Sequence, residues 1–326
     1  TFAILTISNA VIKALISFYL IFFYELTYLA LIFGGIFSYI LLDISLLFLF
    51  RKIISFRFSK VKLKKSLKFS YPTTPRLIID LLYSSVDKLL LNQYKGLSSI
   101  AFYQFGQKFA WVLKMISDSL GKVFGPFFLT MAQERTNNSK QIIIDRFYQM
   151  AFLIMIFGLG IIYFSEEIIK ILVAKEFYPS IKIVPVYVYY YLFGILGMLT
   201  TNQIMFAEKL IYRLPVTISG VFINIILNIL LIPKYGAIGA AIATTFTSMV
   251  SQIVLLYFAQ RAFYLPIGKW RILKIYLLLI FFTLPAYPLL ALDINILLKG
   301  LIKLVIVLLF IIIGINQNYI SKHDIK

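Results

Sequence analysis

Apolar residues gather in this chain in ten blocks, most of them close to the roughly 20 residues that an α-helix needs to cross a membrane. The blocks cover residues 2–24, 27–50, 72–93, 100–131, 147–164, 183–207, 213–232, 236–258, 273–291 and 299–316. Hydrophobic residues make up 61% of the 326 positions, whereas soluble domains hold roughly 45–50%. We therefore predict an all-α, polytopic integral membrane protein with about ten transmembrane helices, which excludes a soluble enzyme.

The positive charge of the chain lies mostly in alternate connections between these blocks. The formal net charge is +19, from 32 lysines and arginines against 13 acidic residues. If residues 51–70 are cytoplasmic, the connections on that side hold 19 basic residues and the opposite connections hold 7. This asymmetry obeys the positive-inside rule. The charge therefore predicts topology and contact with anionic lipid, and it does not indicate nucleic acid as a partner.

The chain lacks the residues that several kinds of active site require. It has no cysteine, and its single histidine is His323 in the polar tail. A paired-histidine metal site needs two histidines, and we expect no serine-histidine centre from a lone histidine in the polar tail. No G-x-x-x-x-G-K-[ST] run is present to bind ATP phosphates. We predict no catalytic residue, no metal and no cofactor.

Two neighbouring blocks, 72–93 and 100–131, carry charges that a helix facing lipid does not hold. A charge near the bilayer centre costs about 3 kcal/mol or more unless it meets water or a partner. The eight charged side chains are our candidate substrate-cavity and transport residues: Arg76, Asp80, Asp87, Lys88, Lys108, Lys114, Asp118 and Lys122.

The short connection between these two blocks makes them antiparallel, so that opposite charges fall at equal depth three times. The three pairs are Arg76 with Asp118, Asp80 with Lys114, and Asp87 with Lys108. At 100° per residue, Lys108 lies away from the face that Lys114 and Asp118 share, so the sequence favours the first two pairs over the third. Same-helix pairs, such as Lys114 with Asp118, compete at four-residue spacing.

Two roles for these charges remain open. They can neutralise one another as fixed struts, or the cations can face a central cavity and receive an anionic head group while an aspartate exchanges between a lysine and a proton. Lysine suits the second role because it binds such a group as a point charge and can release it. Lys88 and Lys122 lie nearer the helix ends, where a lysine can extend to the interface.

An approximate internal repeat relates the start of the chain to its second half. Laying Ser8 on Ser219 brings Tyr24 onto Tyr235. The offset of about 210 residues corresponds to about six helices, and transporters often consist of such repeated bundles. Residues 1–50 are then expected to be the last two helices of a first six-helix lobe, with about four further helices upstream. We expect that residues 1–326 alone do not transport.

Two stretches carry a family resemblance. The first is residues 67–97, with the triplet Val86-Asp87-Lys88, and the second is residues 224–244, NIILNILLIPKYGAIGAAIAT. They resemble polysaccharide or O-unit flippases of the Wzx type, in the multidrug/oligosaccharidyl-lipid/polysaccharide (MOP) exporter superfamily. The resemblance implies a two-lobed MATE/MOP-like bundle that lacks its first helices. The implied parts are 1–52, the end of the N-terminal lobe; 53–70, a basic cytoplasmic linker; 71–260, a six-helix C-terminal lobe; and 261–326, two additional helices and the tail.

The function that the resemblance implies is a flippase of the bacterial inner membrane. Its substrate is an oligosaccharide linked to polyprenyl pyrophosphate, an O-antigen or capsule repeat unit, and its partners are anionic lipid and the glycan polymerase machinery. A drug or cation antiporter of the same superfamily is the alternative, which a net cationic lumen disfavours. An integral-membrane glycan polymerase is a third possibility, but no Asp-x-Asp occurs and the outer connections are short.

Four further features predict local structure. Gly236, Gly239, Ala240 and Ala243 put small residues where two helix backbones can approach closely. Asn224 and Asn228 lie one turn apart and can hydrogen-bond across helices, which favours a packing role over substrate contact. The Gly125-Pro126 pair is expected to end or kink its helix. Residues 165–182 are expected to form a short amphipathic helix on the outer surface.

The charge asymmetry generates a testable topology. We expect the linker 51–70 to lie in the cytoplasm because it concentrates eight basic residues and no acidic one. A single cysteine at Ser59 should therefore resist a membrane-impermeant thiol reagent on intact spheroplasts and react after permeabilisation. Labelling of the intact cells would reverse the predicted orientation.

Overall fold

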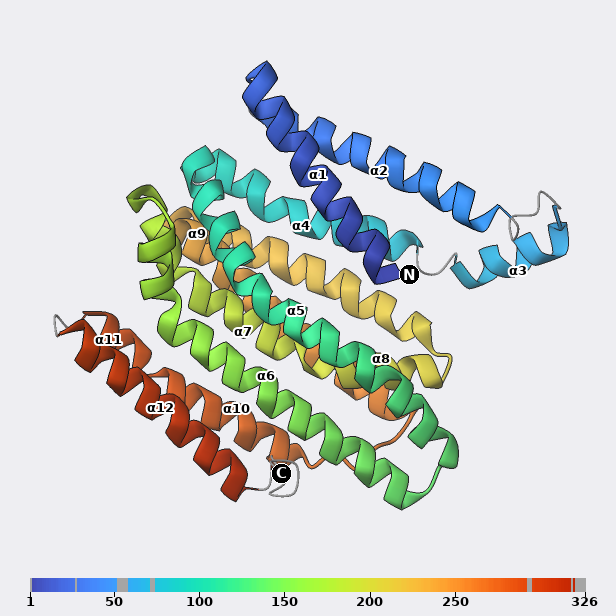
Figure 1. Cartoon of the computed structure of the whole chain (residues 1–326). Helices are drawn as coiled ribbons and strands as arrows, with labels where there is room; N and C mark the ends of the chain where they lie inside the picture. The colour runs from blue at the N-terminus through green and yellow to red at the C-terminus, as the bar shows by residue number, and fades with distance from the viewer. Residues whose placement is uncertain are drawn as a thin grey trace. The chain divides into compact units, whose positions relative to one another are not determined.

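Helices are the only regular elements in the described part of the chain. The computed structural model describes residues 2–26, 28–51, 58–70, 74–291, 295–317 and 319, and it leaves the side chains of residues 68–84 undescribed. The chain divides into two compact units, Thr1–Leu67 and Lys68–Lys326 (Figure 1). The prediction of an all-α chain is confirmed for the described residues.

The first unit is a helical hairpin followed by a basic helix. α1 (Phe2–Tyr24) packs against α2 (Tyr28–Phe50), where Gly34 and Ser38 are buried at the contact. A Cβ atom at Gly34 would overlap Oγ of Ser17 and lie 3.1 Å from its backbone nitrogen, so glycine lets the two helices approach closely here. α3 (Lys60–Ser70) carries the second half of the basic linker and crosses the boundary between the units.

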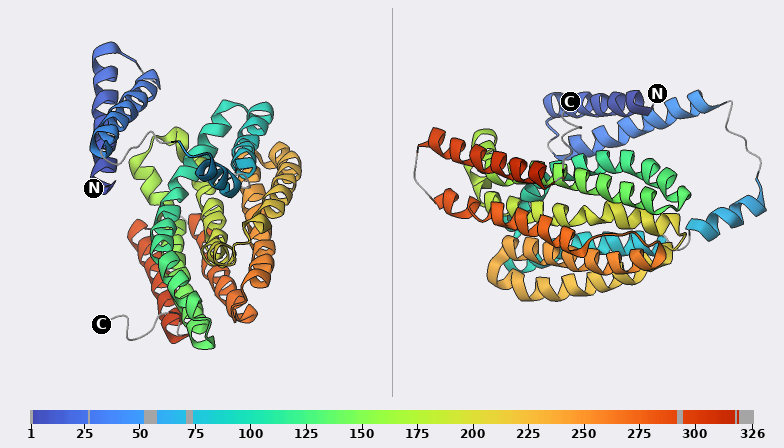
Figure 2. Two further views of the ribbon diagram at one scale, coloured as in Figure 1. Left: turned by 90° about the vertical axis from the view of Figure 1, so that its right-hand side faces the viewer. Right: turned by 90° about the horizontal axis from the view of Figure 1, so that it is seen from below.

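The second unit contains nine α-helices and two short 3₁₀ helices among the described residues. They are α4 (Thr74–Lys95), α5 (Leu97–Glu134), α6 (Asn137–Leu172), η1 (Lys175–Lys182), α7 (Val184–Gly194), α8 (Leu196–Phe206), η2 (Leu210–Tyr212), α9 (Arg213–Ala262), α10 (Lys269–Thr283), α11 (Ala286–Ala291) and α12 (Ile296–Asn316). α6 lies beside α5 and α7 and is also in contact with α10 and α12, while α9 packs on α4, α7 and α8 (Figures 1 and 2).

α9 is two antiparallel helices joined by a tight turn, although it is labelled as one element. Gly236 breaks the helix with φ 57° and ψ −132°, a backbone conformation in which any residue with a side chain would be strained. Beyond the turn, a Cβ at Gly239 would lie 2.5 Å from the carbonyl oxygen of Leu231, so the two arms touch through their backbones. The predicted small-residue packing is confirmed here, since Ala240 and Ala243 are fully buried.

The described residues of all ten apolar blocks lie mostly in helix, but one local prediction is wrong and another holds at most in part. Residues 165–182 do not form a separate surface helix: α6 continues to Leu172, with Glu166 and Ile169 buried, and a 3₁₀ helix follows. Of the two outcomes expected at Gly125-Pro126, an end is excluded, because α5 runs eight residues past Pro126 to Glu134, and a kink stays a prediction. A proline removes only one donor, and packing of Phe124 and Phe128 in the core supports the helix on both sides of it.

Length and composition mark six helical segments of the described residues as able to cross a membrane. They are 7–24, 28–50, 137–172, 184–206, 210–262 and 298–316. Segment 184–206 combines α7 and α8, and segment 210–262 contains the whole α9 hairpin. α4 and α5 fall outside this set, and they are the two helices that carry the candidate charges.

Candidate functional site

A buried carboxylate, Asp87 of α4, is the centre of a hydrogen-bond network that joins three helices. Its side chain is 4% exposed. The hydroxyl of Tyr103 on α5 donates to Oδ2, as does the hydroxyl of Thr244 on the second arm of α9, at 2.9 Å. Nδ2 of Asn228, on the first arm, donates to Oδ1 at 2.6 Å. Asp87 therefore holds α4 against α5 and against both arms of the α9 hairpin.

Contacts with further side chains orient the groups that donate to Asp87. Asn228 Nδ2 also donates to Oδ1 of Asn224 at 2.9 Å, and Asn224 Nδ2 donates to the Thr244 hydroxyl at 3.4 Å. The ring of Tyr103 packs edge-on against Tyr187 of α7, with ring centroids 5.4 Å apart. The prediction that Asn224 and Asn228 hydrogen-bond across helices is confirmed.

The pair of Asp87 with Lys108, which the sequence favoured least of the three, is not formed. Lys108 is exposed on α5, whereas Asp87 bonds to Tyr103, more than one turn earlier on the same helix. The depth argument put Asp87 and Lys108 at the same level in the membrane, but the face of α5 that meets α4 carries Tyr103 and not Lys108. Lys88 lies beside Asp87 along α4 and is half-buried. Two neutral hydroxyls and an amide thus satisfy the carboxylate in place of a lysine.

Lys114 and Asp118 form an ion pair within α5, which is the same-helix alternative that the spacing allowed. Their side chains are 45% and 55% exposed, and neither contacts a described charge on another helix. Lys122 is exposed further along α5. Arg76 and Asp80 lie on α4, but their side chains are outside the described part of the structure. The candidate charges therefore fall into two groups. Asp87 is buried and hydrogen-bonded to neutral side chains, whereas the charged side chains of α5 are accessible.

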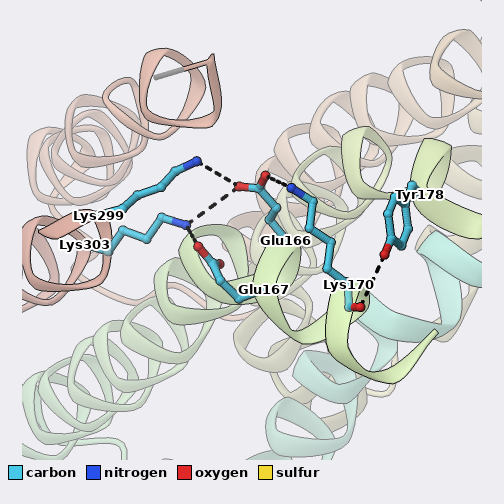
Figure 3. A network of polar contacts seen from close by, with 6 residues as sticks. All are labelled: Glu166, Glu167, Lys170, Tyr178, Lys299 and Lys303. Carbon is cyan, nitrogen blue, oxygen red and sulfur yellow. Dashed lines mark hydrogen bonds and ion pairs between the residues drawn. The ribbon is translucent and has the colours of Figure 1, made fainter. Parts of the chain in front are cut away.

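A second charged cluster, which the sequence did not reveal, joins α6 to α12 (Figure 3). Lys170 Nζ donates to Glu166 Oε1 at 2.7 Å, and Lys299 Nζ lies 3.4 Å from Glu166 Oε2. Lys303, only 1% exposed, donates to Glu167. The surface helix predicted for residues 165–182 includes Glu166 and Glu167, and pairing them with lysines more than 130 residues away requires knowing that α12 packs on α6.

The oxygen atoms around Asp87 have a chemistry that suits a hard cation. They come from a carboxylate, two carboxamides and a hydroxyl, which are the ligand types that such cations take. Oδ1 of Asn228 is buried without a hydrogen-bond partner. No cluster of three or more histidine, cysteine, aspartate or glutamate residues occurs among the described residues. In the geometry seen here, the donors of Tyr103, Thr244 and Asn228 already occupy the carboxylate.

The arrangement of these helices places the protein in the class of polytopic, all-α membrane proteins with the MOP fold. The structure is similar to that of the lipid II flippase MurJ in its inward closed conformation, with a TM-score of 0.70, 20% sequence identity, and coverage of 95% of this chain and 67% of that one. At this identity, the likeness shows the fold.

The family follows from the sequence match. Residues 1–182, more than half of the chain, match the family described as "Polysaccharide biosynthesis protein", and the chain belongs to this family. The family that the motifs predicted is thereby confirmed.

Two relatives share sequence with this chain, and both are longer than the part that it matches. An uncharacterized membrane protein of Methanocaldococcus jannaschii is 27% identical over 190 residues, covering 56% of this chain and 36% of the relative. The capsular polysaccharide biosynthesis protein CapF of Staphylococcus aureus is 23% identical over 266 residues, covering 77% and 65%. The chain thus spans between about one third and two thirds of the lengths of these relatives.

The Asp87 network predicts a large, local loss of stability. Asp87→Ala removes the acceptor that Tyr103, Thr244 and Asn228 share and should cost on the order of 3–5 kcal/mol. Asp87→Asn should cost less, because Asn228 can rotate its unpartnered oxygen toward the new amide. The thermal unfolding midpoint in detergent measures both effects. Asp118→Ala, at the exposed carboxylate of α5, is the control, and an equal loss there would contradict the assignment.

Proposed function

We propose that this protein moves oligosaccharides linked to polyprenyl pyrophosphate, such as O-antigen or capsule repeat units, across the cytoplasmic membrane by alternating access. Membership of the polysaccharide biosynthesis family supports the substrate class, and the likeness to the fold of the lipid II flippase MurJ supports a transporter in place of a catalyst. CapF, a capsular polysaccharide biosynthesis protein, is a relative over most of this chain.

The observation that carries the proposal is the row of accessible cations on α5. Lys108 and Lys122 are exposed and have no ion-pair partner among the described residues, and Lys114 shares only the exposed Asp118 of its own helix. A strut between helices would be paired and buried, as Lys303 is in its contact with Glu167. Accessible lysines on a transmembrane helix attract an anion instead. Together with Arg76, Asp80, Asp87 and Lys88, they remain our candidates for the substrate pathway.

The domain roles belong to the same proposal. Residues 1–52 complete an N-terminal lobe, residues 53–70 form a cytoplasmic linker on anionic lipid, and residues 71–260 form the second lobe with two additional helices after it. The two lobes rock about a central cavity that receives the pyrophosphate. The proposed location is the bacterial inner membrane, beside the glycan polymerase machinery.

Neutralising Lys114 tests this role. In the full-length protein, Lys114→Gln should change stability by no more than about 1 kcal/mol, because the Lys114–Asp118 pair is exposed, while transport should collapse with the lost charge. Lys114→Arg should keep part of the transport activity. Membrane abundance and surface glycan, measured in a strain that lacks its own flippase, report the two properties.

The matched control is Lys182→Gln, an exposed lysine of η1 outside the long helices, which should behave as the unmodified protein. If Lys114→Gln instead lowers abundance, and Asp118→Asn added to it restores both abundance and surface glycan, then Lys114 is a strut and the cavity role is wrong.

A further inference from the structure

A hollow inside the α9 hairpin has a polar lining that no contact described above explains. Its volume is about 200 Å³, and besides Tyr190 of α7 both arms of α9 line it. The polar residues that α9 contributes are Arg213, Thr217, Thr247, Ser248, Ser251 and Gln252. Most of α9 is apolar, so this concentration of polar side chains at one hollow is unusual for a helix pair in lipid.

Three of these polar side chains have no hydrogen-bond partner among the described residues: Ser248, Ser251 and Gln252. Oε1 of Gln252 is also buried. The hydroxyls of Thr217 and Thr247 donate to carbonyl groups of their own helices, which leaves their oxygens able to accept. Unpartnered polar groups destabilise a protein in lipid unless water or a ligand bonds to them. The hollow therefore has the hydrogen-bonding capacity of a binding site.

The charge and size of the hollow define the group that fits. Its lining includes one guanidinium, that of Arg213, and no carboxylate. A guanidinium suits a phosphate, while serine hydroxyls and a carboxamide both donate and accept, as the hydroxyl groups of a sugar require. At about 200 Å³ it is smaller than the roughly 300 Å³ or more that drug-sized ligands occupy, so it fits one sugar ring and not an oligosaccharide.

The depth of the hollow fits the loading side of the membrane. Residues 247–252 lie 11 to 16 positions after the turn at Gly236, or about 16–24 Å along the helix. In the predicted topology this turn faces outward, so the hollow and Arg213 lie in the cytoplasmic half of the hairpin.

We infer that this hollow binds the sugar-phosphate end of the lipid-linked saccharide, with Arg213 pairing with the phosphate and with Ser251 and Gln252 hydrogen-bonding to the first sugar. The inference rests on the proposed function and adds to it a subsite on the α9 hairpin, separate from the accessible cations of α5.

Binding of a soluble fragment tests the subsite. The full-length protein in lipid nanodiscs is titrated with radiolabelled N-acetylglucosamine 1-phosphate, and with free N-acetylglucosamine and inorganic phosphate as separate arms. The sugar phosphate should bind saturably and about tenfold more tightly than either fragment, because it uses both parts of the site. Gln252→Leu and Arg213→Gln should each weaken binding about tenfold.

Ser119→Ala is the matched control, because this exposed hydroxyl bonds only to its own helix on α5. Gln252→Leu removes an amide whose buried oxygen has no partner, so the thermal unfolding midpoint should stay the same or rise. A lower midpoint with unchanged binding would assign Gln252 a packing role and overturn the inference.

Phosphate that binds as tightly as the sugar phosphate would also overturn the sugar site. Either of these two results would overturn the subsite alone: the proposed function still holds if the unmodified protein transports lipid-linked saccharide. Conversely, intact binding in a protein that moves no lipid-linked saccharide contradicts the proposed function and not the subsite.

Discussion

The second unit depends on keeping one carboxylate inside a low-dielectric bundle. A buried charge is costly unless hydrogen bonds satisfy it, and Asp87 meets this condition with donors from α5 and from both arms of α9. Each donor is itself placed by packing: Tyr103 against Tyr187, and Asn228 against Asn224. The close backbone contact at Gly239 brings the two arms near enough for Asn228 and Thr244 to reach the same side chain.

The charges of this unit then fall into two kinds. Asp87 and Lys303 are buried and partnered: Asp87 joins α4 to α9, and Lys303, paired with the partly exposed Glu167, joins α12 to α6. The charges of α5 are accessible, and the polar lining of the α9 hollow is unpartnered at Gln252. Buried pairs hold helices in place, whereas the exposed Lys108 and Lys122 and the unpartnered hydrogen-bonding groups of the hollow can bind a ligand without first breaking a described contact. This division is the physical basis for assigning packing to one set and substrate to the other.

The sequence predicted the helices and the family, since apolar length and the 224–244 motif need no tertiary information. It also predicted that Asn224 and Asn228 bond across helices. It did not predict the partners of Asp87, because equal depth says nothing about which face of α5 turns toward α4. The Glu167–Lys303 contact was missed for a related reason: two helices far apart in the chain must first be known to be neighbours. Lys114 paired within its own helix, where spacing alone is sufficient.

Transfer of a lipid-linked saccharide between leaflets tests the central claim most directly. Full-length protein is reconstituted into liposomes that carry a fluorescent polyprenyl-pyrophosphoryl saccharide, and a membrane-impermeant quencher reports how much of it remains in the outer leaflet over time. The account predicts that transfer is faster than in protein-free liposomes and is slowed by excess unlabelled substrate. Transfer no faster than in protein-free liposomes, together with uptake of a cationic dye, would contradict it and favour a cation antiporter.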